Sequence, residues 1–257
     1  MRPPSRFDPT GRFAGLADLY ARHRPGYPDA ALDRIAEFAE LSADSLLVDV
    51  GSGTGISARL MARRGVPVIG IEPNDDMQRK AEAESLPDGM PRPQYRAGTA
   101  EATGLPDGCA TAVLAAQAFH WFEAAAALSE FHRILRPGGA VALMWNERDE
   151  SDAFTAAFGA VIRTAPDAAA IEGPRARAGE VLLHHPLFRD AVREVFKGEQ
   201  VLDEEGVLGR AFSASYAPRE PPAADRFARA LREVFAAFQR DGKVTLRYVT
   251  TVYLARR

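Results

Sequence analysis

An apolar run that ends in three closely spaced glycines occupies residues 46–55: Leu46-Leu47-Val48-Asp49-Val50-Gly51-Ser52-Gly53-Thr54-Gly55. The apolar half has the length of a buried β-strand, and a helical pattern begins directly after the glycines. Glycines at such a junction allow a tight turn and let a ligand touch main-chain atoms at the helix N-terminus. The run therefore predicts a strand, a ligand-binding turn and a helix, in that order.

Further apolar runs of strand length follow, and segments with helical spacing lie around and between them. This alternation predicts parallel strands joined by helical crossovers, which is an α/β fold. The expected strands are residues 46–50, 66–71, 94–98, 112–117 and 140–146, and the expected helices are residues 28–40, 55–64, 75–84 and 123–135.

The second half of the chain has a different pattern. Residues 151–240 are mostly helical in spacing and are interrupted by prolines, which predicts a helical lid that covers the sheet. Within them, residues 191–202 are expected to form an edge strand. Residues 243–256 alternate β-branched and aromatic side chains, which predicts a final strand paired antiparallel with that edge strand.

We therefore expect one domain over residues 1–257. Residues 28–150 would form a ligand-binding core, built on a Rossmann-like, doubly wound sheet of seven strands. Most of these strands would be parallel, with an antiparallel C-terminal strand. Residues 1–30 and the helical lid would shelter whatever small molecule the core binds.

Composition and charge exclude several classes of protein. The chain has 257 residues, of which 46% are hydrophobic and 26% charged, so it can form a core and stay soluble. A formal net charge of -3 gives no general attraction to nucleic acids or anionic lipids. It has no run of about 18 apolar residues, no signal-peptide pattern and one cysteine, Cys109. We expect a cytoplasmic protein with neither a nucleic-acid nor a membrane partner.

An acidic residue completes the ligand-binding pattern. Glu72 ends the second predicted strand, where a carboxylate can accept both hydrogen bonds of a ribose diol, so the pattern indicates an adenosine-containing cofactor. A nicotinamide dinucleotide is disfavoured, because Ile56 departs from the spacing of the G-x-G-x-x-G fingerprint. Asp49 would repel a pyrophosphate, whereas it suits a cationic sulfonium ligand that carries an amino group.

Six short motifs lie in order between residues 20 and 146. They are Tyr20-Ala21-Arg22-His23-Arg24-Pro25-Gly26-Tyr27-Pro28, the glycine turn, Ile71-Glu72-Pro73-Asn74, Gly98-Thr99-Ala100-Glu101, Gln117-Ala118-Phe119-His120-Trp121-Phe122 and Leu135-Arg136-Pro137-Gly138-Gly139. With these motifs the chain resembles the class I S-adenosylmethionine-dependent methyltransferases, in particular the trans-aconitate-methyltransferase-like small-molecule enzymes with a methyltransferase type 11 domain. The resemblance extends more loosely to the C-terminus.

The resemblance implies that S-adenosylmethionine is the cofactor. Gly51, Gly53 and Gly55 would line its methionine end, Glu72 would hold the ribose hydroxyls, and Met77 would cover one adenine face.

For the adenine amino group the chain departs from the family. Many relatives have an aspartate where this chain has Thr99. The acceptor of the amino group is therefore Thr99 itself, Glu101 or the main chain around Ala100.

The remaining expected site residues come from two motifs. Tyr20 and Arg24 lie where the family's N-terminal segment folds over the cofactor, and an arginine suits a carboxylate. Gln117 would end the fourth strand beside the reacting methyl group. Trp121 and Phe122 either wall the acceptor pocket or belong to the core.

A catalytic base is a separate question. His120 follows the fourth strand and could take a proton from a hydroxyl or amine, so it is our candidate for the catalytic base. The alternative is that His120 anchors the loop around Trp121. His184 and His185 lack further ligands nearby, so no metal site is expected. Cys109 has no evident activating base, and no Gly-x-Ser-x-Gly motif is present.

The expected activity is methyl transfer from S-adenosylmethionine to a small-molecule acceptor by direct displacement. The sequence leaves open whether a carboxylate, hydroxyl, amine or carbon is methylated. Two alternatives belong to other classes: a protein that binds S-adenosylmethionine as a structural or electrostatic element without methylating, and a nicotinamide-dependent oxidoreductase.

Overall fold

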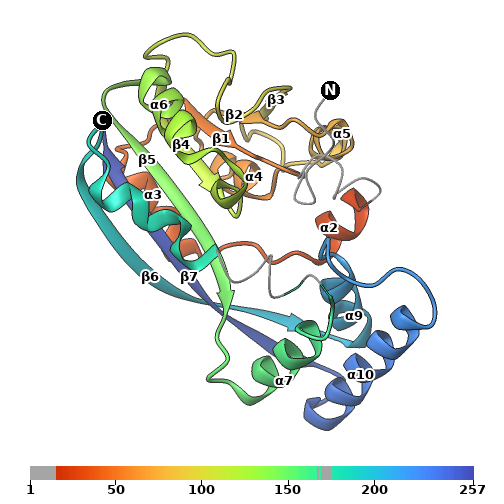
Figure 1. Cartoon of the computed structure of the whole chain (residues 1–257). Coiled ribbons are helices and arrows are strands. Elements are labelled where there is room, and N and C mark those ends of the chain that lie inside the picture. Colours follow the sequence, from red (N-terminus) through yellow and green to blue (C-terminus); the bar gives the residue numbers. More distant parts are fainter. Residues whose placement is uncertain (1–15, 167, 169–174) are drawn as a thin grey trace, which may run out of the picture.

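The computed structural model describes residues 16–166, 168 and 175–257 (Figure 1). Its centre is a seven-stranded sheet with the order β3-β2-β1-β4-β5-β7-β6. Residues 1–15, which we expect to help shelter the acceptor, lie outside the described residues. The strands are β1 (Leu47–Val50), β2 (Val68–Ile71), β3 (Gln94–Arg96), β4 (Ala110–Ala116), β5 (Leu135–Arg148), β6 (Arg189–Leu202) and β7 (Val244–Arg256).

Strand directions confirm the predicted α/β sheet. The first five strands pair in parallel, and β7 runs antiparallel to both of its neighbours, β5 and β6. Every residue of β1, β2 and β4 is buried, as expected for parallel strands that are covered on both faces.

Helices cover both faces of the sheet (Figure 1). Alternate residues of β4 point to opposite faces: Ala112 and Leu114 pack with α3 and α4, whereas Val113 and Ala115 pack with α6. The helices and 3-10 segments are α2 (Ala17–His23), α3 (Asp29–Phe38), α4 (Ile56–Ala62), α5 (Asp75–Ala83), η1 (Phe119–Trp121), α6 (Ala124–Ile134), α7 (Ala153–Ile162), η2 (Arg175–His184), α9 (Glu204–Phe212) and α10 (Ala223–Phe238).

The predicted elements are present, but some bounds differ. The strand expected over residues 94–98 ends at Arg96, because a turn closed by backbone bonds between Thr99 and Ala102 follows. The strand expected over 140–146 begins earlier, at Leu135, and runs on to Arg148. The two C-terminal strands pair as expected, although α9 and α10 stand between them in the sequence, so they do not form a tight hairpin.

The helical lid is built on the free ends of β6 and β7. Both strands are long, with 14 and 13 residues, and they extend past the rest of the sheet toward α7, α9 and α10 (Figure 1). Buried side chains from these strands and helices form a core cluster separate from the two on the faces of the sheet. Helix α2 contacts α9 of the lid and α5 of the sheet layer, so it bridges the two parts.

The core cluster of the helical lid predicts that two phenylalanines contribute differently to the free energy of unfolding. Phe158 of α7 is fully buried, whereas Phe238 at the end of α10 is 39% exposed. Phe158→Ala should lower the free energy of unfolding by about 3–5 kcal/mol because it leaves a cavity. Phe238→Ala, the matched control, should cost about 1 kcal/mol. Equal losses in urea unfolding would contradict a packed lid.

Candidate functional site

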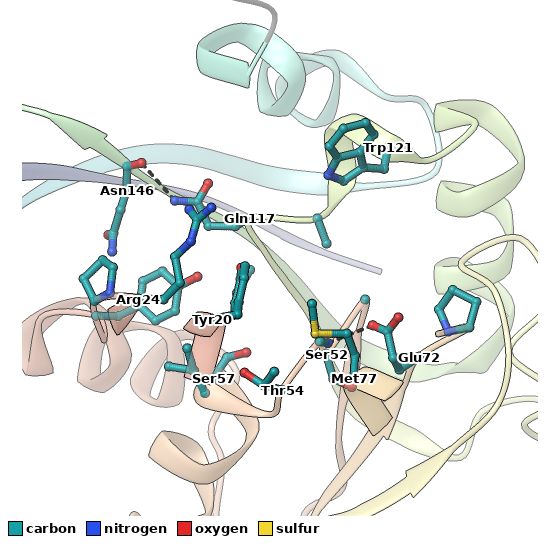
Figure 2. A pocket seen from close by; sticks show the side chains of 18 of the residues that line it. Tyr20, Arg24, Ser52, Thr54, Ser57, Glu72, Met77, Gln117, Trp121 and Asn146 are labelled. Atoms are coloured by element: carbon teal, nitrogen blue, oxygen red, sulfur yellow. Dashed lines mark hydrogen bonds between the residues drawn. The ribbon is translucent and has the colours of Figure 1, made fainter. Parts of the chain in front are cut away.

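A hollow lies at the carboxyl ends of β1, β2 and β4, and Tyr20 of α2 forms part of its wall (Figure 2). The hollow and the open space at its mouth together amount to about 950 Å³. We call it the cavity. Its wall includes nine of the residues expected from the sequence: Tyr20, Arg24, Gly51, Gly53, Glu72, Met77, Gln117, Trp121 and Phe122.

The glycine turn forms the floor of the cavity. Gly51 has φ 70°, in the left-handed region, and a Cβ there would lie 2.6 Å from the Cβ of Ala118. Gly53 has φ 54°, and its missing side chain leaves open space. Gly51 therefore needs glycine for both its backbone conformation and its close approach to Ala118, whereas Gly53 needs it for the backbone conformation alone.

Glu72 is fixed by two backbone N–H groups. Its Oε2 accepts from Gly53 N at 2.8 Å and its Oε1 accepts from Asn74 N at 2.9 Å. The side chain is 8% exposed, and burial raises its pKa although both hydrogen bonds oppose the rise. Each carboxylate oxygen retains the capacity for a further hydrogen bond from a ligand hydroxyl.

Asp49 lies beneath the turn and is not part of the cavity wall. It is fully buried, and its Oδ2 accepts from Ser57 Oγ at 2.6 Å, while Oδ1 has no partner among the described residues. Burial raises the pKa of Asp49 to about 7; the hydrogen bond from Ser57 opposes this, and the charge of Glu72 adds to it.

Several buried polar atoms on the cavity wall have no hydrogen-bond partner among the described residues. They are Ser52 Oγ, Thr54 Oγ1, Gln117 Oε1 and Arg24 Nε. Buried polar atoms in native proteins are nearly always paired, so these atoms indicate that a polar ligand belongs in the cavity.

Gln117 stands at the end of β4 and is tied to β5. Its φ is 57°, which ends the strand, and its backbone N donates to Met144 O at 2.7 Å. Its Nε2 donates to Asn146 O at 2.9 Å, and Asn146 Nδ2 donates to Gly26 O at 2.9 Å. These bonds connect both strand ends to the segment after α2.

Arg24 follows α2 and is partly buried. Its guanidinium lies 4.7 Å from the centre of the Tyr20 ring and donates to Ser213 O at 3.3 Å. Burial lowers the pKa of Arg24, and the nearby positive charge of Arg210 lowers it further. Figure 2 shows Arg24, Gln117 and Asn146 at one end of the cavity and Glu72 with Met77 at the other.

The apolar residues of the cavity wall differ in whether they also pack in the hydrophobic core. Met77 of α5 is 3% exposed and lies beside Glu72. Phe122 reaches the cavity, but its ring also packs edge-on against Phe119 and Phe131, at 5.9 and 6.4 Å between ring centres. Phe122 therefore serves the core as well as the cavity wall.

Other expected residues lie away from the cavity wall: Asp49, Gly55, Thr99, Ala100, Glu101 and His120. The Glu101 Oε1 atom accepts from Glu123 N at 2.9 Å, and Ala100 is 3% exposed. The adenine-binding role of Thr99, Ala100 and Glu101 stays a prediction.

His120 is partly buried beside two tryptophans. Its Nδ1 accepts from Trp145 Nε1 at 3.3 Å, and its ring centre lies 4.9 Å from that of Trp121. Burial, and secondly the charge of Arg175, lower its pKa to about 3. A histidine with this pKa and an occupied Nδ1 is a poor proton acceptor near neutral pH, so the geometry favours the loop-anchoring alternative.

Sequence reasoning missed several wall residues. Asn146 ends the fifth predicted strand, so its position at the carboxyl edge of the sheet was a usable signal. Ser57 and Tyr27 carried weaker signals, because each lies close to a recognised motif. Arg210 of α9 carried none, because only the folding of the lid brings it to the cavity.

The comparisons with known proteins agree with this geometry. Residues 48–143 match the family model described as a methyltransferase domain. This segment contains β1, the glycine turn, Glu72 and Gln117. The chain therefore carries a methyltransferase domain.

Relatives of the methyltransferase domain occur in distant organisms. The chain is 35% identical over 158 residues to an uncharacterised methyltransferase of Mycobacterium tuberculosis. The matched region covers 62% of this chain and 61% of that protein. It is 28% identical over 214 residues to an uncharacterised methyltransferase of Geobacillus kaustophilus, covering 80% and 89%. The match thus spans less than two thirds of the mycobacterial relative.

Solved structures share the fold of the methyltransferase domain. A structure from Anaeromyxobacter dehalogenans, designated a type II methyltransferase, has a TM-score of 0.63 at 24% identity and covers 91% of this chain and 97% of that one. The 4+2 cyclase SpnF has a TM-score of 0.52 at 18% identity, covering 95% and 93%. At these identities the likeness establishes the fold.

Two features are absent from the described residues. Within residues 16–166, 168 and 175–257, no group of three or more His, Cys, Asp or Glu could hold a metal ion. No helix in the same residues is both long and apolar enough to cross a membrane.

Asp49 predicts an unusual pH dependence of stability. Burial raises its pKa from 3.8 to about 7, so the folded protein holds a proton that the unfolded chain has released. Stability should therefore fall as pH rises across this interval, and Asp49→Asn should remove the loss, which is at most about 4 kcal/mol.

Urea unfolding at pH 4.5 and pH 8 measures this effect. The gain in stability of the variant relative to the native protein should be larger at pH 8 than at pH 4.5. The same substitution at exposed Asp44 is the control. A gain that is equal at both pH values would contradict the raised pKa.

His120 should stay neutral through the physiological range. Because its pKa lies near 3, its ring resonances in NMR spectra should show no protonation between pH 8 and pH 5. The His120→Asn variant identifies the resonances by their loss. An inflection between pH 6 and pH 7 would restore His120 as a candidate base.

Proposed function

We propose that this protein is an S-adenosylmethionine-dependent methyltransferase that acts on a small molecule by direct displacement. The observation that carries the proposal is the fixed Glu72 carboxylate beside the glycine turn, within a methyltransferase domain. An acid at the end of β2 and a glycine turn after β1 together suit the ribose and the main-chain contacts of an adenosine cofactor.

The cavity residues fit this cofactor. When bound, S-adenosylmethionine would supply a methyl group on a positively charged sulfur. Glu72 would accept hydrogen bonds from the ribose hydroxyls, and Met77 would pack against the adenine. The hydroxyls of Ser52 and Thr54 on the same wall have no hydrogen-bond partner within residues 16–166, 168 and 175–257, and they would find polar partners on the ligand.

The opposite end suits the amino-acid part of the cofactor. Arg24 has a cationic guanidinium, and its Nε has no hydrogen-bond partner among the described residues, which suits a carboxylate. Gln117 Oε1 is an acceptor that also has no partner in the described part of the chain, which suits an ammonium group. Asp49 would act through the turn above it, because it does not reach the cavity wall itself.

Methyl transfer makes modest demands on the protein. The acceptor forms its bond to the methyl carbon as the carbon–sulfur bond breaks, so alignment and exclusion of water supply much of the rate. Trp121 and Phe122 would wall the acceptor space. The low pKa of His120 suits an acceptor that needs no strong base.

A small acceptor fits the surroundings of the cavity. Helix α2 and the lid helix α9 both contribute wall residues, Tyr20 and Arg210, so the space is roofed on the side away from the sheet. A roofed cavity excludes a long polymer more readily than an open groove does. The net charge of -3 also disfavours nucleic acid, and a cytoplasmic location remains our expectation.

A second candidate function uses the cofactor without methylating. The observation in its favour is that the fold is shared with SpnF, which is named as a cyclase. Both candidates require S-adenosylmethionine binding, and they differ in whether methyl-labelled cofactor yields a labelled acceptor.

Titration calorimetry with S-adenosylhomocysteine tests the shared requirement. The native protein should bind it with micromolar affinity. Glu72→Gln should weaken binding at least about 10-fold, or 1.4 kcal/mol, because the new amide NH₂ faces backbone N–H donors.

Glu37→Gln, at an exposed position on α3, is the matched control and should bind as the native protein does. NAD should produce no heat of binding. Binding of NAD in place of S-adenosylhomocysteine would overturn the proposal in favour of an oxidoreductase.

A further inference from the structure

Glu147 brings a carboxylate to the acceptor side of the site. It follows Asn146 near the end of β5, and its side chain is partly buried. Among the residues that the structure describes, none forms a hydrogen bond or an ion pair with this carboxylate. Glu150, by contrast, has its Oε1 atom 2.6 Å from the Arg163 guanidinium and 3.5 Å from Arg148 Nε. Glu147 therefore retains the capacity of a carboxylate to accept hydrogen bonds from a ligand.

Glu147 lines a second hollow, which adjoins the cavity. This hollow and the open space at its mouth together amount to about 650 Å³. It has four lining residues in common with the cavity: Arg24, Gln117, Asn146 and Arg210. Gln117 stands at the end of β4, where we expect the reacting methyl group. A molecule in the second hollow that reaches toward Gln117 therefore occupies a space that Glu147 borders.

Two opposing influences set the proton affinity of Glu147. Burial raises its pKa and is the largest influence. The positive charges of Arg175 on η2 and Arg193 on β6 act in the opposite direction and limit the rise. The other ionisable residues that line the second hollow are Arg24, Arg148, Arg210, Glu150 and Tyr248. Because its pKa is raised, Glu147 is a stronger base than an exposed glutamate.

Other titratable groups near the cavity are less suited to take a proton from an acceptor. The pKa of His120 is about 3, and its Nδ1 already accepts a hydrogen bond. Glu72 lies at the opposite end of the cavity, where it would hold the ribose (Figure 2). Asp49 is not part of the cavity wall. Of these four groups, Glu147 is the one that lines the second hollow.

The charges of the second hollow favour one class of acceptor. A carboxylate acceptor has no proton to lose, and the negative charge of Glu147 would repel it. A protonated amine would be repelled by Arg24 and Arg210, which line the same hollow. An acidic hydroxyl is neutral, and in a phenol it has a pKa of about 10, within reach of a weak base. The rings of Trp121 and Phe122 on the cavity wall also suit a flat, conjugated acceptor.

We propose that the methyl acceptor carries an acidic hydroxyl, phenolic or enolic, and that the Glu147 carboxylate takes the hydroxyl proton. The inference rests on the proposed function and deepens it, because it names an acceptor class and a catalytic base. The hydroxyl oxygen gains the methyl group in place of its proton, and Glu147 becomes a neutral carboxylic acid. The negative charge lost from Glu147 balances the positive charge lost from the sulfur.

Titration calorimetry on the protein saturated with S-adenosylhomocysteine tests recognition of the hydroxyl. Phenol and anisole are the probes, since anisole is phenol with a methyl group in place of the hydroxyl hydrogen. The native protein should bind phenol at least about 10-fold more tightly than anisole, because only phenol can donate a hydrogen bond to Glu147. Benzoate and benzylamine represent a carboxylate and an amine acceptor. Tighter binding of either one than of phenol overturns the hydroxyl acceptor.

Variants connect this preference to Glu147. Glu147→Gln should remove most of the preference for phenol, because a neutral amide oxygen accepts a weaker hydrogen bond than a carboxylate does. Glu147 does not line the cavity, so the variant should keep the native affinity for S-adenosylhomocysteine. Glu233→Gln, at an exposed position on α10, is the matched control. If Glu147→Gln fails to fold, as circular dichroism will show, Glu147→Asp, which withdraws the carboxylate by one methylene, decides the question.

Turnover of phenol with methyl-labelled S-adenosylmethionine tests the base. The native protein should form labelled anisole, and kcat should rise with pH as Glu147 loses its proton. Glu147→Gln should lower kcat at least about 100-fold, leave KM for S-adenosylmethionine unchanged and remove that rise. A purely structural role would not change the pH profile. Absence of labelled anisole, or equal turnover by the variant, overturns the base.

The outcomes separate the two proposals. Native binding of S-adenosylhomocysteine with no preference for phenol, or with one that Glu147→Gln leaves unchanged, overturns the hydroxyl acceptor and leaves the cofactor assignment intact. Failure of the native protein to bind S-adenosylhomocysteine overturns the proposed function. The same probes are then titrated into the free protein: a preference for phenol that Glu147→Gln removes retains a hydroxyl site, and no such preference overturns it.

Discussion

The hydrogen bond from Gly53 N to Glu72 Oε2 ties the turn after β1 to the end of β2. The rest of the site depends on it, because it fixes the floor and one end of the cavity together. The turn can approach this closely only because Gly51 has no side chain to collide with Ala118. Asp49 lies buried beneath the same turn, so the fold retains a carboxylate whose charged form is disfavoured by burial.

The lid completes the site through the long antiparallel strands. Because β6 and β7 extend past the sheet, they carry α9 to the cavity and place Arg210 opposite the glycine turn. Helix α2 then closes the space between lid and sheet, held to α9 by the bond from Arg24 to Ser213. Arg24 and Arg210 lie outside the matched methyltransferase domain, whereas the glycine turn and Glu72 lie within it.

Local signals in the sequence predicted the features that depend on short-range interactions, namely the strands and the glycine turn. Periodicity predicted the sheet and its antiparallel end, and the spacing of Gly51 and Glu72 predicted two residues that line the same cavity. What escaped prediction depends on tertiary contact: Arg210 reaches the cavity only through the lid, and the burial of His120 lowers its pKa below the range of a base. Asp49 was placed correctly in the strand, but its depth beneath the turn could not be predicted from spacing.

The most direct test of the central claim is a crystal structure of the protein with S-adenosylhomocysteine. Our account predicts the ribose hydroxyls on Glu72, the adenine against Met77 and the carboxylate at Arg24. The sulfur would then lie near Gln117, where we expect the reacting methyl group. A ligand bound outside the cavity, or one whose ribose does not touch Glu72, would contradict the account.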